Sequence, residues 1–174
     1  MKKTLLSLII AFNLSAAVWS IPIQVKEGEW QNKNNYGWMA ENHTTMLSVS
    51  SRFDAKQVIS ENDLERYFKL KMRNFNRDLK FIDEFEKDYS NSFLSIDLEL
   101  FKYNDKLNIY TGFLHMKVTP SINIKSRIDD YTYTISVSGS DTQIKQFVKE
   151  NIDAMVEKFV EDTYYMQDLM KAKK

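Results

Sequence analysis

The sequence predicts a two-layer α+β domain, in which helices cover one face of an antiparallel sheet of about four strands and the last helix is long. Two segments, 93–103 and 131–138, alternate apolar and polar residues, as half-buried strands do. Two others, 60–75 and 141–160, repeat apolar residues at three- and four-residue steps, which is typical of amphipathic helices. Strands and helices of this kind stack as two layers around one core.

The first strand and the first helix are predicted within residues 45–75. Residues 45–53 alternate in character, and the side chains expected on one face are Thr45, Leu47, Val49 and Phe53. Ser60 belongs to the preferred N-cap residues, so a helix is expected to begin directly after it. The apolar face of that helix comprises Leu64, Tyr67, Phe68, Met72 and Phe75. Residues 79–89 fit a second helix or the start of a strand, and helix is the favoured prediction.

A β-hairpin is predicted around the turn residues Asn104 and Asp105. Its first strand carries one apolar face, formed by Leu94, Ile96, Leu98 and Leu100. The apolar register of the return strand changes across Gly112, which predicts a bulge at this glycine. A further strand over 131–138 has on one face Tyr131, Tyr133, Ile135 and Val137.

A long helix is predicted after Ser140, which forms a capping-box pattern with Gln143. Its apolar stripe comprises Ile144, Val148, Ile152, Met155 and Phe159. As a helix, residues 141–171 would span about 46 Å, whereas an eleven-residue strand spans only about 36 Å. Asp162 and Thr163 also interrupt the stripe. We therefore expect the helix to pack on the sheet to about Val160, followed by a tail that frays, bends or meets something else.

This layout resembles small periplasmic modules such as the amino-terminal domain of the TolB type. The terminal helix across a sheet also resembles the helix-grip fold, which holds lipids. Both resemblances rest on the order of the elements, and fold does not determine function, so they imply no site residues.

The first twenty residues have the pattern of a secretory signal peptide. Lys2 and Lys3 precede an apolar run, and small residues follow it; the run is too short to span a bilayer. Cleavage is expected after Ser20, with Ala17 as the alternative. The organisation is then a signal peptide at 1–20, an extended aromatic and polar lead-in at 21–44 and one domain at 45–174. We expect a periplasmic or secreted protein without a transmembrane span.

The composition of the exported chain excludes several classes of function. Removal of the two lysines leaves 22 basic against 24 acidic residues, a net charge of −2, so a dedicated nucleic-acid binder is not expected. The chain has no cysteine, which excludes disulfides, a thiol nucleophile and a cysteine-based metal site. The two histidines, His43 and His115, have no partner at metal-ligand spacing.

No catalytic motif is apparent in the sequence. Ser138-Gly139-Ser140 is explained by the helix cap rather than by a nucleophile elbow, and there is no glycine-rich phosphate loop. Asp97 and Glu99 share the polar face of a strand, so a glycosidase-like hydrolase is the least favoured hypothesis. The protein is expected not to be an enzyme and to use neither a cofactor nor a metal.

Aromatic residues near both ends of the exported chain are the predicted binding residues. They are Trp30, Tyr36 and Trp38 in the lead-in, and Tyr164, Tyr165, Met166, Leu169 and Met170 in the tail. The first hypothesis is a non-enzymatic envelope module that binds another protein through the lead-in, the exposed strand face or the tail, and self-association is compatible with it. The alternative is a carrier of a small apolar ligand or lipid, with a pocket between the sheet and the last helix. The residues expected to line that pocket are Tyr131, Tyr133, Met155 and Phe159.

Overall fold

The computed structural model describes residues 36–75, 79–83, 91–104, 106, 108–121 and 130–172. The predicted signal peptide and the first part of the lead-in lie outside these residues. In chain order the elements are α2 (Trp38–Glu41), β1 (Thr44–Phe53), α3 (Ala55–Val58), α4 (Glu61–Phe75), β2 (Lys80–Ile82), β3 (Asn91–Asn104), β4 (Ile109–Pro120), β5 (Tyr131–Ser140) and α5 (Asp141–Lys171).

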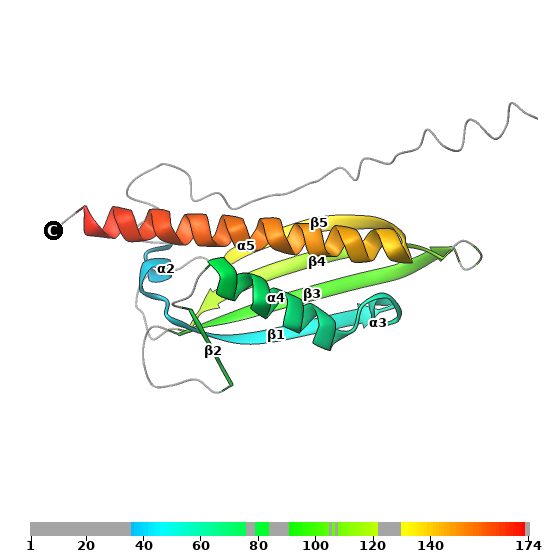
Figure 1. Cartoon of the computed structure of the whole chain (residues 1–174), viewed down its shortest axis with the longest axis horizontal. Helices are drawn as coiled ribbons and strands as arrows, with labels where there is room; N and C mark the ends of the chain where they lie inside the picture. Colours follow the sequence, from blue (N-terminus) through cyan, green and yellow to red (C-terminus); the bar gives the residue numbers. More distant parts are fainter. Residues whose placement is uncertain are drawn as a thin grey trace, which may run out of the picture.

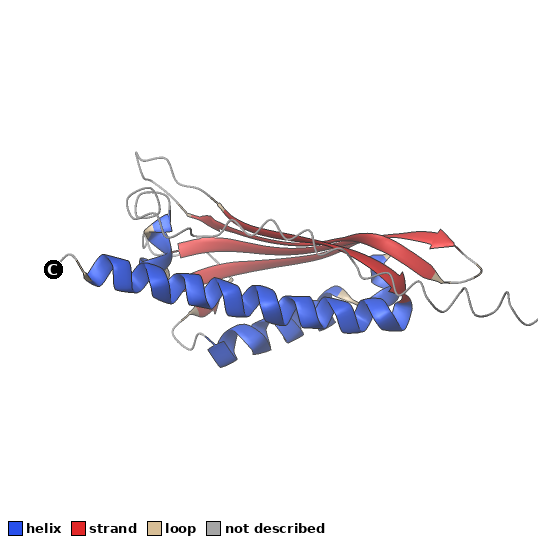
Figure 2. Ribbon diagram, turned by 90° about the horizontal axis from the view of Figure 1, so that it is seen from above, coloured by secondary structure: helices blue, strands red, loops and turns tan. Residues whose placement is uncertain are grey.

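The predicted α+β class and two-layer arrangement are confirmed. Five strands form one sheet in the order β2-β1-β3-β4-β5, and α4 and α5 lie side by side on one of its faces (Figure 1). Seen along the sheet, the two long helices α4 and α5 are on that side, and no described helix covers the opposite face (Figure 2). The sheet therefore has one face in the core and one open face.

The sheet is mixed, which corrects the predicted antiparallel arrangement of about four strands. β3, β4 and β5 are antiparallel to one another, but β1 is parallel to both β3 and β2. The reason is the helix between β1 and β2. α4 carries the chain back along the sheet, and a strand that follows such a crossover enters in the same direction as the first. The alternation of apolar and polar residues within a strand does not indicate whether the strand runs parallel or antiparallel to its neighbours.

The segment after α4 also differs from the favoured helical prediction. Residues 80–82 form the short edge strand β2, and the Lys80 N–H donates to the His43 carbonyl at 2.8 Å. The remainder of the predicted helix, from residue 84, lies outside the described residues. One short helical element, α3, was not expected from the pattern.

The predicted hairpin forms, but its irregularity is not at Gly112. Gly112 pairs regularly with Leu100, and the register shifts instead between Lys102 and Asn104. A Cβ at Gly112 would lie 1.8 Å from the Glu99 carbonyl oxygen. Glycine is needed here because the two strands approach closely, not because the strand bulges.

The start of α5 confirms the predicted capping box. The Ser140 N–H donates to Gln143 Oε1 at 2.9 Å, and Ser140 is the N-cap in extended conformation. α4 begins with a related cap, since the Asp63 N–H donates to Ser60 Oγ at 3.1 Å. Both helix starts could therefore be predicted from the local sequence.

Of the outcomes predicted for the segment after Val160, the structure shows the third: the segment does not fray but meets another element, α2. α5 continues as a helix to Lys171, and Met166 is fully buried, as are the polar residues Asp162 and Thr163. The end of α5 lies over α2 (Figure 1). This short helix corrects the expectation that the lead-in is extended as far as residue 44. It also packs on the part of α5 that is too long to be covered by the sheet alone.

Polar residues on the buried stripe of α5 are satisfied inside the molecule. Thr163 donates its hydroxyl to the Phe159 carbonyl at 2.8 Å. Asp162 accepts from the Tyr131 hydroxyl at 3.0 Å and from Lys158 Nζ at 2.6 Å. Burial raises the pKa of the Tyr131 phenol well above its ordinary value, with Asp162 as the second cause. The phenol therefore remains a donor, and the stripe is continuous in space although it is interrupted in the sequence.

Candidate functional site

Most of the predicted aromatic lead-in residues serve packing where the structure describes them. Tyr36 is buried and Trp38 is half-buried against the core. Trp30 lies outside the described residues. Buried rings have no surface left for a partner, so Tyr36 is not available as a contact residue.

The predicted tail residues divide into buried and exposed groups. Met166 is buried, and Tyr165 and Leu169 pack partly against the core. Tyr164 is 50% exposed and Met170 is 41% exposed. Since α2 packs against α5, the structure brings the lead-in and the tail together, but it does so by burying part of both.

The predicted carboxylate pair lies on the open face of the sheet. Arg52 bridges the two acids, with Nη1 3.2 Å from Glu99 Oε1 and Nη2 3.7 Å from Asp97 Oδ1. Ser50 also donates its hydroxyl to Asp97. Asp97 and Glu99 are thus bound by side chains of the neighbouring strand β1, so both acids have structural partners. Among the described residues, no group of three or more His, Asp or Glu side chains is placed to hold a metal ion.

Four exposed aromatic residues gather where β1 ends and β3 meets β4, and we name this surface the aromatic corner: Phe53, Phe101, Tyr103 and Phe113. The rings of Phe53 and Phe101 have centroids 4.3 Å apart. Phe113 is the register partner of Glu99, which makes it the diagonal neighbour of Phe101 on the same face. Tyr103 is 78% exposed, at the register shift of β3.

The backbone at Phe53 is what turns this ring toward β3. Its φ is +56°, a left-handed conformation that bulky residues rarely adopt. Asp54 fixes the position, since its N–H donates to the Leu100 carbonyl at 3.0 Å and its carboxylate accepts from the Lys102 N–H at 2.8 Å. Strain held in place by surrounding hydrogen bonds is often found at functional positions.

The sequence itself contains a signal for the aromatic corner. Phe101 and Phe113 have odd numbers, as do Asp97 and Glu99 on the polar face of the same hairpin. A large ring on the water-facing side of a regular strand is stronger evidence for a binding surface than an aromatic residue in an irregular segment. The Phe53 ring had no such signal, because its orientation depends on the positive φ.

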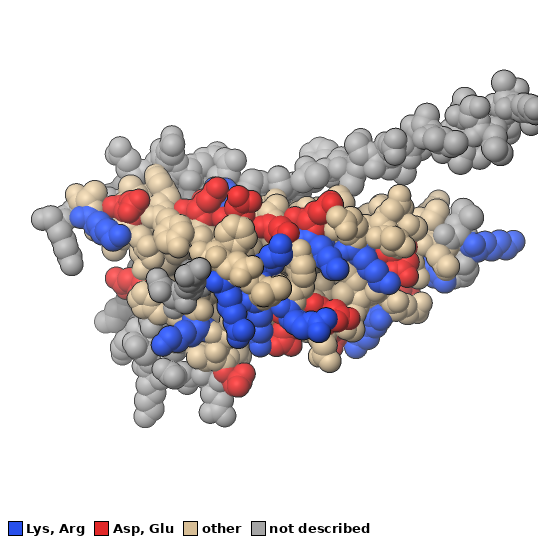
Figure 3. All heavy atoms as spheres, in the orientation of Figure 1, with Lys and Arg blue, Asp and Glu red and all other residues tan. Residues whose placement is uncertain are grey.

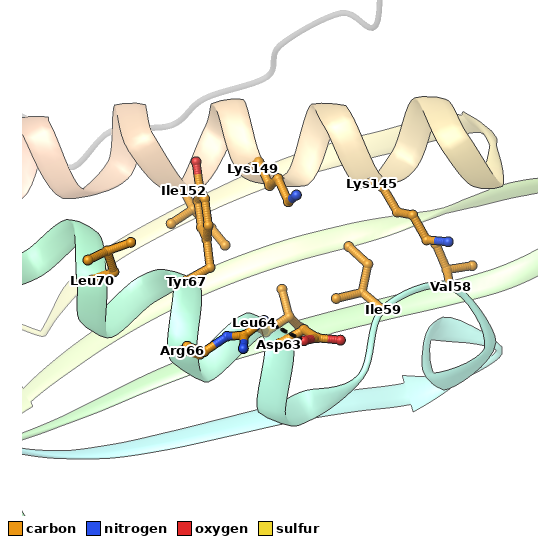
Figure 4. Close-up of a pocket in the computed structure, with 10 residues that line it drawn as sticks. All are labelled: Val58, Ile59, Asp63, Leu64, Arg66, Tyr67, Leu70, Lys145, Lys149 and Ile152. Atoms are coloured by element: carbon orange, nitrogen blue, oxygen red, sulfur yellow. Dashed lines mark hydrogen bonds and ion pairs between the residues drawn. The ribbon is translucent and has the colours of Figure 1, made fainter.

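A second feature is a groove between the helices α4 and α5 (Figure 4). Its volume is about 370 Å³, and its lining comprises Val58, Ile59, Asp63, Leu64, Arg66, Tyr67, Leu70, Lys145, Lys149 and Ile152. Lys and Arg side chains are frequent along α4 and its border with α5 in the space-filling view (Figure 3). The groove is therefore apolar at its base and basic at its rim.

Tyr67 stands in this groove on a polar network. Its hydroxyl donates to Asp153 at 2.9 Å, and Lys71 Nζ donates to the same carboxylate at 2.8 Å. Burial raises the pKa of Tyr67, and the hydrogen bond with Asp153 raises the pKa of Lys71. The lysine therefore stays charged and the phenol stays neutral at physiological pH, which fixes the ring between the two helices.

The groove is not the predicted ligand pocket. The residues expected to line a space between the sheet and α5 fill that space instead. Tyr131, Met155 and Phe159 are buried, and the rings of Tyr131 and Phe159 make an edge contact at 5.2 Å. These described side chains therefore pack in the core at the place where the ligand was expected.

Comparisons with known proteins assign this chain to no family. No family model matches it, and no curated protein matches its sequence. It is similar to two structures of a PelC dodecamer from Paraburkholderia phytofirmans, each 9% identical, with TM-scores of 0.48 and 0.47. The match covers 68% of this chain in both, and 88% and 87% of the respective PelC chains. A "putative lipoprotein" from Caulobacter crescentus is 7% identical, with a TM-score of 0.32, covering 79% of this chain and 95% of the other.

These similarities are too low to indicate a shared function. Within the described residues, no helix is both long and apolar enough to cross a membrane.

Proposed function

We propose that the protein is an exported, non-enzymatic protein-binding module of the cell envelope, and that the aromatic corner is its contact surface. The observation that carries the proposal is the presence of four exposed aromatic residues at one end of the sheet, Phe53, Phe101, Tyr103 and Phe113, each between 45% and 78% exposed. The partner we expect is a protein segment that presents apolar side chains to these rings.

The amount of exposed aromatic surface supports a binding role. With roughly 200 Å² per aromatic side chain, the exposed fractions amount to on the order of 400 Å². The largest apolar patch of an ordinary monomer is about 300–600 Å² and is often functional. A standard interface needs about 800 Å² per partner. The partner would therefore also cover part of the surrounding polar sheet face.

The chemistry around the rings fits the usual anatomy of a protein interface. Aromatic residues and Arg are enriched in the energetically dominant centres of interfaces, and Arg52 lies beside Phe53 with its charge partly balanced by Asp97 and Glu99. Hydroxyl side chains on the same face include Thr111, Thr134 and Ser136. Such residues provide a polar rim whose hydrogen bonds a partner can complete.

Site-specific crosslinking in the native envelope tests the proposal. A photoreactive amino acid is placed at Phe113, and a matched control is placed at Tyr164, a predicted tail contact on α5 that this proposal does not use and that is exposed to a similar degree. We expect a discrete protein adduct from position 113 and none from position 164. The mass of the adduct separates a second copy of this chain from a different protein.

Two outcomes would contradict the proposal. One is the absence of any protein adduct from position 113 and from a second probe at Tyr103. The other is an equal set of adducts from positions 113 and 164, which would show unspecific contact rather than a binding surface.

A further inference from the structure

We infer that the groove between α4 and α5 binds a single-chain amphiphile with one carboxylate, such as a fatty acid. Its acyl chain would lie against Ile59, Leu70 and Ile152, and its carboxylate would lie at Lys149. This site is separate from the aromatic corner and does not depend on the proposed protein partner.

The apolar part of the groove has a fixed base and an exposed wall. Val58, Leu64 and Ile152 are buried and form the base, whereas Leu70 is 54% exposed above it (Figure 4). An exposed leucine beside buried apolar residues leaves apolar surface in contact with water. A bound acyl chain would remove that surface from water, which favours the complex.

The charges at the rim favour one anion. Three cationic side chains and a single carboxylate line the groove. Arg66 is paired with that carboxylate, Asp63, at 3.3 Å. Lys145 is paired with Asp141 at 2.8 Å. In the part of the chain that the structure describes, Lys149 has no carboxylate within ion-pair distance.

The nearest candidate partner of Lys149 is already engaged. Asp153 lies one turn further along α5, but it accepts from Tyr67 and from Lys71. Lys149 Nζ instead lies 5.7 Å from the centre of the Tyr67 ring, a cation–π arrangement that leaves its three donors open to another acceptor. One unbalanced positive charge next to an apolar groove matches a monoanionic headgroup.

The size of the groove restricts the ligand to one chain. A volume of about 370 Å³ lies near the lower end of the range of ligand sites, about 300–1,000 Å³. A two-chain phospholipid would need more space than the groove provides. A single acyl chain with a small headgroup is the ligand class that meets both the charge and the volume.

Calorimetric titration of the purified protein with decanoate below its micellar concentration tests the inference. We expect saturable binding with one decanoate per chain. Lys149→Gln, which keeps most of the side-chain length, should weaken binding about tenfold, because one charged hydrogen bond is lost. Leu70→Asn should also weaken it. Lys171→Gln, on the same helix but outside the groove, is the matched control and should bind as the unchanged protein does.

Decanol and acetate separate the two parts of the site. Decanol should bind at least tenfold more weakly than decanoate and should be insensitive to Lys149→Gln, and acetate should not bind. The inference is overturned if decanoate shows no saturable binding, if decanol binds as tightly as decanoate, or if Lys171→Gln weakens binding as much as Lys149→Gln. A Phe101→Ser/Phe113→Ser variant should retain decanoate binding, so the failure of one proposal is distinguishable from the failure of the other.

Discussion

Replacement of Met166 by Ala tests whether the carboxyl end of α5 belongs to the core. The side chain is fully buried, beyond the point at which the sequence predicts that the helix leaves the sheet. Truncation to Ala removes apolar atoms equivalent to about three methylene groups, or about 2.4 kcal/mol of transfer free energy. A residual cavity adds to this, so we expect the free energy of unfolding to fall by about 3 kcal/mol.

Urea denaturation followed by circular dichroism measures this loss, and Met170→Ala is the control. Met170 is on the same helix, four residues further on, and is 41% exposed, so its replacement should change the free energy of unfolding by less than about 0.5 kcal/mol. The melting temperature of the Met166→Ala variant should fall by about 6–12 °C. If the two variants unfold alike, the end of α5 is not part of the core and the packing of α2 against it is wrong.

Three further predictions concern the sheet, the buried network and the pH dependence of stability. Gly112→Ala should prevent soluble folding or lower the melting temperature severely, because the new Cβ would meet a backbone oxygen at 1.8 Å; normal expression and melting would contradict the close strand approach. Tyr131→Phe should lower the free energy of unfolding in urea by about 1–3 kcal/mol, since it removes the donor to buried Asp162, whereas no loss would show that the acid is satisfied without it. The hydrogen bond from the Ser51 N–H lowers the pKa of Glu61. This carboxylate therefore stabilises the fold above its unfolded-state pKa, and the contribution is lost as pH falls through the folded-state pKa. Glu61→Gln should reduce the loss of stability between neutral and acidic pH, and an unchanged pH profile of stability would refute this.

Local patterns predicted the elements of this fold better than they predicted the relations between elements. The alternation around Leu98 and the capping boxes of α4 and α5 each depend on neighbours within a few residues, so the sequence was sufficient to place them. The parallel pairing of β1 with β3 depends on the crossover through α4. The packing of the carboxyl end of α5 against α2 joins segments over a hundred residues apart in sequence. Neither relation produces a pattern in the neighbouring sequence from which it could be predicted.

The candidate surface shows the same limit. Irregular segments rich in aromatic residues drew attention, yet Tyr36 supplies packing rather than contact surface. The rings that remain exposed lie in the most regular part of the chain, and they include Phe101 and Phe113. Their positions on the polar face of the hairpin could have been recognised. The stack with Phe53 could not, because it requires the left-handed backbone at that residue.

The most direct test of the central claim is the capture of partners from the native envelope with three forms of the tagged protein, quantified by mass spectrometry. The forms are the unchanged protein, Phe101→Ser/Phe113→Ser and the control Tyr164→Ser, each checked for an unchanged melting temperature. The proposed function predicts one or more proteins that are retained by the unchanged protein and the control but lost from the double variant. Equal recovery of every captured protein with all three forms would contradict a binding role for the aromatic corner.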